Sequence, residues 1–269
     1  MKNKPETIAI IGAGRLGQAI AKGLVASKLY NPSEIILTKR DVSSLEEFES
    51  NGYQVTSENE LAIKKSEVLI FSVGPRDLET LLKSEKNNFS SSKHIIVSTV
   101  AGININSIEK SIGEGVPVVR IMPNVAIEKC QSMTCMASNE NHQKSLLIIK
   151  DIFESVGYTY TVNEDLIGPA TALCGSGLAF FLRSIRAAAH GGTEIGFHAE
   201  EALLLAAQTA KGAASLVLES SDHPETQIDK VTTPRGITIA GLNEMEHSGF
   251  TSAMINAIVK SANKINEVK

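Results

Sequence analysis

The feature that most constrains the fold of this chain is an alternation in its first 160 residues. Short apolar runs, rich in Val and Ile, are separated by amphipathic segments, and the runs are Ile8–Ile11, Ile35–Leu37, Val68–Val73, Ile95–Val100 and Val118–Met122. Runs of this kind are typical of strands buried on both faces of a parallel sheet. Their alternation with helical segments predicts a doubly wound α/β sheet.

From Asn163 onward the pattern changes, and no convincing strand follows. Segments at helical spacing, rich in Ala and Leu, take over: Leu166–Ala189, Ala199–Leu218, Ile237–His247 and Thr251–Asn263. We therefore expect an α/β domain over residues 1–162 and an all-helical domain over residues 163–269. Because Leu203–Ala207 and Ala213–Val217 are apolar around much of the helix, we expect this domain to bury more than one face, as a dimer interface would.

Composition narrows the classes of function. The 269 residues have a formal net charge of −4, which argues against a basic nucleic-acid footprint. The odd count of cysteines (Cys130, Cys135 and Cys174) argues against a disulfide-stapled secreted domain. No apolar run approaches the roughly 20 residues that span a bilayer, and no signal-peptide core is present. We expect a soluble cytoplasmic protein with no metal, because the six histidines show no ligand spacing.

A glycine-rich turn follows the first apolar run. The pattern GxGxxG is matched by Gly12-Ala13-Gly14-Arg15-Leu16-Gly17, which opens a helix. In this context the first glycine permits the tight turn, the second lets the backbone approach a pyrophosphate, and the third lets helix and strand pack closely. The helix N-terminus then offers free N–H groups to the phosphates. The sequence therefore predicts a dinucleotide site here, the alternative being an ordinary strand–helix turn.

The end of the second apolar run indicates which dinucleotide is bound. NAD-binding proteins usually place an acidic residue there, about 20 residues beyond the glycines, to hold the ribose 2′-hydroxyl. Here the run ends in Thr38, Lys39 and Arg40, with no carboxylate before Asp41. A hydroxyl and two cations suit a 2′-phosphate, so NADPH is favoured, with NADH possible. The alternative is that the two cations are solvated loop charges.

Glycine and proline also mark the ends of later apolar runs. In open α/β folds the ligand lies outside the carboxyl ends of the strands. The residues expected at those ends are Val73, Gly74, Ala101, Gly102, Pro123 and Asn124. Glycine and proline are also common in ordinary loops, so each segment alone is a weak signal. Together the three segments favour a cofactor crevice.

Further motifs follow in order along the chain: Arg120-Ile121-Met122-Pro123-Asn124, Gly175-Ser176-Gly177 and Val231–Leu242. With the glycine loop they resemble the pyrroline-5-carboxylate reductase family over nearly the whole chain. The resemblance implies a Rossmann domain, a helical domain that dimerises by intertwining, and in some members a decamer. It also implies that NADPH or NADH reduces a cyclic imine acid, 1-pyrroline-5-carboxylate, to L-proline, the last step of proline biosynthesis.

The resemblance also implies particular site residues. Thr238 matches the threonine that hydrogen-bonds the ring nitrogen of the substrate, although a first-turn threonine can also bond its own backbone. Glu164 and Lys230 fall at ligand-contacting positions, and Glu164 could equally be a helix-start carboxylate. Asn59 resembles an asparagine that reaches the cofactor, the alternative being a helix cap.

A helix start after Pro234 suggests how a substrate carboxylate is held. Proline is common at a helix start, and the free N–H groups of the first turn suit an anion. We therefore expect Thr233, Gly236 and Ile237, together with Thr238, to bind the substrate.

The chain departs from the family pattern at several positions. Gly74 stands where Lys is usual, Val125-Ala126 where Thr-Pro is usual, Leu178 where Pro is usual, and Arg235 where Gly is usual. Arg235 brings bulk and charge to a loop that must approach the substrate, at a position where glycine tolerates positive φ. Two alternatives therefore stay open: a reductase of another cyclic imine acid, and a non-catalytic nucleotide-binding paralogue.

Overall fold

The computed structural model describes residues 4–113 and 115–265. The chain divides into two compact units, which are named here the sheet unit, through Gly175 and again from Ala262, and the helical unit, Ser176–Ser261. The sequence places this division earlier, at 162/163. The reason for the difference is that the first helical turns after the sheet stay with the strands, since Ile167 and Ala170 pack against Met122.

The sheet unit contains one mixed sheet, and its strand order among the described residues is β3-β2-β1-β4-β5-β6-β7-β8. The strands are β1 (Ile8–Ile11), β2 (Ile35–Thr38), β3 (Gln54–Thr56), β4 (Val68–Phe71), β5 (Ile95–Ser98), β6 (Val118–Met122), β7 (Ser132–Ser138) and β8 (Gly157–Thr161). All neighbours pair in parallel except β6 and β7, which are antiparallel. The order reverses between β1 and β4, so the carboxyl ends of those strands form the switch point where ligands bind in such sheets.

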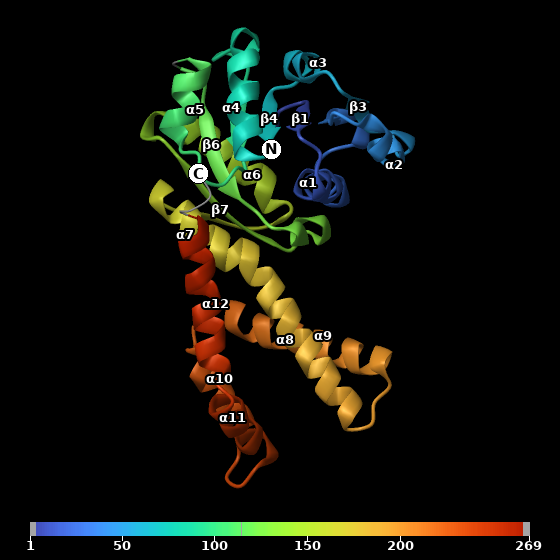
Figure 1. The fold of residues 1–269 in the computed structure, drawn as a ribbon, viewed down its shortest axis with the longest axis vertical. Helices are drawn as coiled ribbons and strands as arrows, with labels where there is room; N and C mark the ends of the chain where they lie inside the picture. Colours follow the sequence, from blue (N-terminus) through green and yellow to red (C-terminus); the bar gives the residue numbers. More distant parts are fainter. Residues whose placement is uncertain (1–3, 114, 266–269) are drawn as a thin grey trace. The chain divides into compact units, whose positions relative to one another are not determined.

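Helices cover both faces of this sheet (Figure 1). Ile8 and Ile10 of β1 belong to one core, whereas Ala9 and Ile11 belong to the other, because successive side chains of a strand point to opposite faces. The first core holds α1 (Arg15–Ala26), α2 (Glu46–Ser50) and α6 (Gln143–Glu154). The second holds α3 (Asn59–Lys65), α4 (Pro75–Ser84) and α5 (Ile105–Ile112). The doubly wound fold predicted from the sequence is confirmed.

The helical unit has almost no core of its own. Its elements are α8 (Gly177–Glu194), α9 (Ala199–Leu218), α10 (Pro224–Val231), α11 (Ile237–His247) and the first part of α12 (Phe250–Ile265). Among its described residues, the buried apolar side chains are those of Ala189 and Ala202. A Cβ on Gly192 of α8 would lie 3.0 Å from the Cβ of Ala202 in α9, so a glycine permits the close packing of this pair.

One helical stretch of the described chain is long and apolar enough to cross a membrane. It covers Glu164–Glu194, and an 18-residue window within it has a mean hydropathy of 1.4. The expectation that no apolar run reaches spanning length is therefore wrong, because Gly, Ser and Thr interrupt the larger apolar side chains without making the 18-residue window polar on average. Length and composition alone are weak evidence, however, since the core helix of a soluble protein passes the same test.

This stretch is not one regular helix. It passes through α7 (Ile167–Ala170) and a π-helical turn (Thr171–Ser176) before α8 begins at Gly177. The glycines of Gly175-Ser176-Gly177 therefore mark a change of helix type. Turns of this kind inside helices are frequent at functional sites.

Candidate functional site

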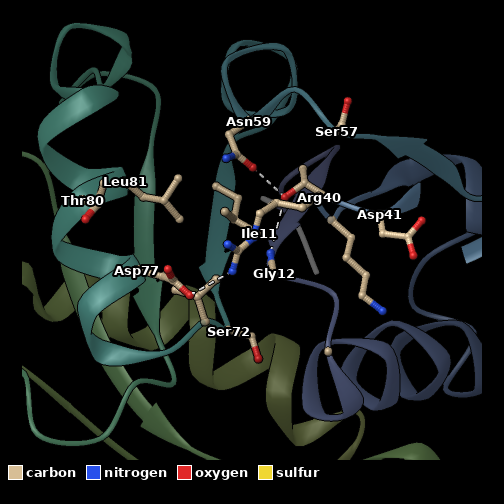
Figure 2. Close-up of a pocket in the computed structure, with 14 residues that line it drawn as sticks. Ile11, Gly12, Arg40, Asp41, Ser57, Asn59, Ser72, Asp77, Thr80 and Leu81 are labelled. Atoms are coloured by element: carbon tan, nitrogen blue, oxygen red, sulfur yellow. Dashed lines mark hydrogen bonds and ion pairs between the residues drawn. The ribbon is translucent and has the colours of Figure 1, made fainter. Parts of the chain in front are cut away.

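A cavity of about 480 Å³ opens at the carboxyl ends of β1, β2 and β4 (Figure 2). Its lining combines the glycine loop, the end of β2 and the first turns of α4: Ile11, Gly12, Gly14, Thr38, Lys39, Arg40, Asp41, Ser57, Asn59, Ser72, Val73, Asp77, Thr80 and Leu81. This is the place where open α/β sheets bind their ligands. Of the residues predicted to bind the cofactor, the cavity brings together Gly12, Gly14, Thr38, Lys39, Arg40, Asn59 and Val73.

The three glycines of the loop are required for different reasons. Gly12 has a φ of +90°, and a Cβ there would lie 2.2 Å from Val73 Cγ1. A Cβ on Gly17 would lie 2.9 Å from the Gly12 carbonyl oxygen, so this glycine lets α1 approach the loop. At Gly14 neither reason holds, because φ is −76° and a Cβ would have no neighbour within 4 Å. Space at that position fits a ligand that comes close to the backbone.

The N-terminus of α1 is open to an anion. Gly14 is its N-cap and offers no side-chain cap, and the first turn holds no acidic residue. The unpaired N–H groups and the positive end of the helix dipole therefore face no competing carboxylate on this helix. The loop itself is fixed from β2, since the Thr38 carbonyl accepts hydrogen bonds from Gly12 N–H (3.2 Å) and Ala13 N–H (2.8 Å).

The Thr38 hydroxyl has a different role from the one its position suggests. We expected it to contact a 2′-phosphate, but this side chain is 1% exposed. Its Oγ1 donates to Asn59 Oδ1 at 2.7 Å and accepts from Gly12 N–H at 3.4 Å (Figure 2). Thr38 therefore ties the glycine loop to the start of α3. In this way it positions Asn59 at the cavity.

Two cations remain at the end of β2. Lys39 has no ion-pair partner among the described residues, and Arg40 Nη2 lies 3.4 Å from Asp77 Oδ2 on α4. The Arg40 side chain is 92% exposed and that of Asp77 is 54% exposed, so this ion pair contributes little and can open for a better partner. Asp41 stays ionised nearby, because hydrogen bonds from the Ser43 hydroxyl and N–H lower its pKa.

The other predicted cofactor residues do not line this cavity. They are Arg15, Leu16, Gly17, Gly74, Ala101, Gly102, Pro123 and Asn124. Asn124 is engaged elsewhere, because its Oδ1 accepts from Ala126 N–H at 3.0 Å and its Nδ2 donates to the Cys174 carbonyl at 2.9 Å. Gly74 is the N-cap of α4, and a Cβ there would meet only Asp77 Oδ2, at 3.8 Å. The backbone at this position therefore has room for a side chain, so packing does not require glycine in place of the usual Lys.

Glu164 is held by partners inside the sheet unit. Its Oε1 accepts from Arg120 Nη1 at 2.8 Å and from the N–H of Ile105, the first residue of α5, at 2.6 Å. Arg120 on β6 is only 6% exposed, and its Nε has no hydrogen-bond partner among the described residues. The carboxylate therefore neutralises a buried cation and satisfies an orphan donor of α5. This structural role differs from that of a carboxylate at the start of its own helix, and the contact of Glu164 with a ligand stays a prediction.

In the helical unit, Thr233-Pro234-Arg235-Gly236 forms a turn. Gly236 N–H donates to the Thr233 carbonyl at 2.9 Å, and Arg235 has a φ of +58°. A Cβ on Gly236 would lie 2.5 Å from Thr233 Oγ1, so glycine is needed for this packing. The expectation that Gly236 N–H is free for a carboxylate is wrong, because the turn uses it. Arg235 adopts the backbone conformation that glycine accepts most easily.

The remaining predicted substrate residues lie on α10 and α11. Thr238 is the second residue of α11 and is half-buried, and its hydroxyl bonds to no described residue, so the alternative of a backbone bond does not hold. Ile237 is 94% exposed. Lys230 Nζ donates to Asp222 Oδ2 at 2.6 Å, which makes it part of a surface ion pair.

Sequence reasoning missed some residues that the structure brings into play. Asp77 enters the cavity from the first turn of α4, and Arg120 holds Glu164. The signal for Asp77 was an acidic residue just after Gly74-Pro75, where a helix opens opposite two cations. Within the described ranges, no group of three His, Cys, Asp or Glu residues could hold a metal ion.

The fold and the glycine-loop cavity are those of a dinucleotide-binding domain of the kind found in oxidoreductases. A family model described as NADP oxidoreductase coenzyme F420-dependent matches residues 7–102. A second, described as pyrroline-5-carboxylate reductase dimerisation, matches residues 164–268. The two models fall on the sheet unit and on the region that holds the helical unit.

Relatives that match nearly all of this chain identify the family. The chain is 45% identical to pyrroline-5-carboxylate reductase 2 of Dictyostelium discoideum, over 98% of this chain and 93% of that protein. It is 51% identical to pyrroline-5-carboxylate reductase 1 of the same organism, of which it spans half the length. The crystal structure of 1-pyrroline-5-carboxylate reductase from Streptococcus pyogenes superposes with a TM-score of 0.83 at 31% identity, covering 97% of this chain and 98% of that one. The chain belongs to the pyrroline-5-carboxylate reductase family.

Proposed function

We propose that this protein reduces 1-pyrroline-5-carboxylate to L-proline with NADPH, the last step of proline biosynthesis. The observation that carries the proposal is the match to a named reductase over 98% of this chain and 93% of that relative. The match runs through both units.

The cavity of the sheet unit fits a dinucleotide phosphate. The glycine loop and the open N-terminus of α1 suit the pyrophosphate, and Lys39 and Arg40 suit a 2′-phosphate. When bound, the cofactor supplies the hydride. In our proposal Asp77 releases Arg40 to the phosphate, a stronger partner than an exposed carboxylate.

The helical unit would bind the imine. The half-buried Thr238 hydroxyl has no partner among the described residues, so it can accept from an iminium N–H and afterwards donate to the amine product. It therefore orients the ring nitrogen and favours its protonated form, which makes the ring carbon a better hydride acceptor. The unpaired N–H groups of Ile237 and Thr238 at the start of α11 suit the substrate carboxylate. Much of the rate enhancement would come from orientation.

The helical unit would act as a dimer. Its large side chains are exposed, including Phe181, Leu204 and Ile255, and a second copy would cover them. The family model that matches this region is one of dimerisation. Whether the dimers assemble further into a decamer is decided by the mass of the assembly in solution.

The test is oxidation of NADPH, followed at 340 nm, with racemic 1-pyrroline-5-carboxylate. We expect turnover with the wild type and a loss of at least about 10-fold in kcat for Thr238→Ala, equivalent to one strong hydrogen bond. Arg40→Ala should raise the KM for NADPH and leave the KM for NADH nearly unchanged, because only NADPH has the 2′-phosphate. Lys150→Ala serves as the control, since its ammonium is paired with Glu154 on α6 and it is not among the predicted site residues.

If fluorescence shows that NADPH binds but no cyclic imine acid is reduced, the proposal is contradicted. The protein would then be a non-catalytic, nucleotide-binding paralogue. Turnover on a different imine acid alone would move attention to Arg235 and Leu178, where the chain departs from the family pattern.

A further inference from the structure

Two thiols meet where β7 contacts the π-helical turn. Cys135 Sγ and Cys174 Sγ are 4.0 Å apart, although 39 positions separate the residues in the chain. Cys135 is 6% exposed and Cys174 is partly exposed. Both lie in one small apolar cluster with Met122, Ile167 and Ala170, all within the sheet unit.

The third cysteine lies in a different place. Cys130 Sγ contacts the Gly23 carbonyl oxygen at 3.7 Å and packs against the other core. The close pair is therefore not a general consequence of cysteine burial in this fold. Because Cys130 has no thiol next to it among the described residues, it provides an internal control for the pair.

The two sulfur atoms are in van der Waals contact but are not bonded. A disulfide has a sulfur–sulfur distance of about 2.05 Å, so the two sulfur atoms need to approach by roughly 2 Å. Cys174 belongs to the π-helical turn Thr171–Ser176, which interrupts the regular helix. Movement of one turn at a change of helix type is easier than movement of a strand that is paired on both sides, as β7 is.

The surroundings also make one thiol the better nucleophile. The hydrogen bond from the Cys135 thiol lowers the pKa of Cys174 to about 7, whereas the Cys174 contact and burial raise the pKa of Cys135. The more exposed sulfur is therefore the one that becomes a thiolate, and the thiolate is the reactive form of cysteine.

We propose that Cys135 and Cys174 form a redox-active dithiol that peroxides convert to a reversible intramolecular disulfide. The Cys174 thiolate attacks one oxygen of hydrogen peroxide, the O–O bond breaks, and hydroxide leaves, which gives a sulfenic acid on Cys174. The Cys135 sulfur then attacks the Cys174 sulfur, the S–O bond breaks, and the Cys135 proton leaves with the oxygen as water. The two thiols are oxidised and the peroxide is reduced to water.

The disulfide would act on the loop that holds Pro123 and Asn124, which comes before the helical unit in the sequence. Cys135 is paired in register with Met122, which is followed by Pro123 and Asn124. The Asn124 side chain donates to the Cys174 carbonyl at 2.9 Å, so a shift of Cys174 moves or breaks this hydrogen bond. Cys174 is also the residue before Gly175, where the sheet unit ends. Oxidation should therefore lower the reductase rate, a consequence that rests on the proposed function.

The chemical test uses the full chain and hydrogen peroxide. Free thiols are counted in denaturant before and after oxidation. Linked tryptic peptides are identified by mass and then fragmented to locate the bridged cysteines, because Cys130 and Cys135 share one tryptic peptide. The wild type has three cysteines, and we expect one free thiol after oxidation, with the Cys135 and Cys174 peptides joined and lighter by two hydrogen atoms. Cys130→Ser should form the same link and retain no free thiol. Cys135→Ser and Cys174→Ser should form no intramolecular link.

The Cys130→Ser variant keeps the test decisive even if a substitution at the buried Cys135 prevents folding, because it leaves the pair intact. A link that includes Cys130, a link between two chains, or free Cys135 and Cys174 after oxidation would each overturn the proposal. Iodoacetamide labelling gives a second readout: the midpoint for Cys174 should lie near pH 7 in Cys130→Ser and rise in Cys135→Ala, because alanine donates no hydrogen bond to the Cys174 sulfur.

The functional consequence is measured separately. Oxidised Cys130→Ser should lose at least about 3-fold in rate, and dithiothreitol should restore it by thiol–disulfide exchange. Cys174→Ser should keep its rate under the same treatment. A disulfide that forms without any change in rate would overturn the effect on the Asn124 loop. If the enzyme proves inactive on every imine, thiol counts and peptide masses still decide whether the disulfide forms.

Discussion

The two units of this molecule differ in how they bury their apolar side chains. In the sheet unit, each of the four residues of β1 is at most 1% exposed, and helices cover both faces of the sheet. In the helical unit, Leu204 is 70% exposed, Leu218 is 68% exposed, and the buried apolar side chains among its described residues are two alanines. The first unit closes its core within one chain, and the second leaves large apolar faces open.

This difference shows what an apolar pattern in a sequence can and cannot say. Apolar faces predict burial, but the pattern does not say whether the covering surface comes from the same chain. In the sheet unit the alternation of strands and helices supplies both partners. In the helical unit the same kind of signal indicates a second copy, in agreement with the dimerisation model that matches it.

The largest expected effect comes from comparing a side-chain truncation in the sheet unit with one in the helical unit. Phe153 of α6 is fully buried, so Phe153→Ala should lower the free energy of unfolding by about 4 kcal/mol at every protein concentration. Leu204→Ala should instead cost stability only through assembly, so its effect should depend on protein concentration. Urea denaturation at several concentrations measures both. An effect of Leu204→Ala that is the same at all concentrations would contradict the contrast.

The next effect contrasts two ion pairs. The carboxylate of Glu164 faces the nearly buried Arg120 at 2.8 Å, whereas Asp222 pairs with an exposed Lys230 at 2.6 Å. Glu164→Gln leaves a buried guanidinium uncompensated and should destabilise the sheet unit by about 3 kcal/mol. Asp222→Asn, the matched control, should cost less than about 1 kcal/mol. Similar losses for the two variants, measured by urea denaturation, would show that Glu164 is not structural.

A smaller effect concerns assembly. Leu204 and Leu147 are exposed leucines on helices of the two units, at 70% and 58%. Leu204→Glu puts a charge into the surface that a second copy would bury, and we expect its dissociation constant to rise by at least about 30-fold, or about 2 kcal/mol. Leu147→Glu should leave the dissociation constant unchanged. Sedimentation at a series of concentrations measures it, and an unchanged Leu204→Glu dimer would place the interface elsewhere.

Local signals account for what could be predicted from the sequence. The glycine loop and the strand before it are set by neighbouring residues, and so are α9 and α11, whose predicted bounds match the structure. β3 was missed because it has only three residues, none of them buried. α10 was missed because its sequence, PETQIDKV, lacks an apolar stripe, and the Pro224 that starts it reads as a turn.

Long-range pairings could not be predicted in the same way. Arg120 and Glu164 are separated by 44 positions, and Cys135 and Cys174 by 39. No pattern of neighbouring residues in the sequence predicts that such residues meet. They meet because of the register between β6 and β7 and the path of the turns that follow. The cofactor loop was therefore accessible to sequence reasoning, whereas the partners of Glu164 and the engagement of Asn124 were not.

The smallest expected effect contrasts two backbone positions. Lys28 in the sheet unit and Arg235 in the helical unit have φ values of +61° and +58°, a region where a side chain costs energy. Lys28 follows the C-cap of α1, where glycine is favoured, and Arg235 is the third residue of the Thr233–Gly236 turn. Lys28→Gly and Arg235→Gly should each stabilise the protein by about 0.5 to 1 kcal/mol, because relief of strain exceeds the added entropy of the unfolded chain.

The two variants should separate in activity. Lys28 lies far in sequence from every residue proposed to bind substrate, so Lys28→Gly should leave the KM for the imine unchanged. Arg235 immediately precedes Gly236 and the start of α11, so Arg235→Gly should change this KM about 3-fold or more if its guanidinium contacts the substrate carboxylate, equivalent to about 0.7 kcal/mol. An equal gain in stability with no change in KM would mean that the arginine is tolerated only for its backbone conformation. Steady-state kinetics on both variants, alongside urea denaturation, decides between a substrate contact and a strained turn residue.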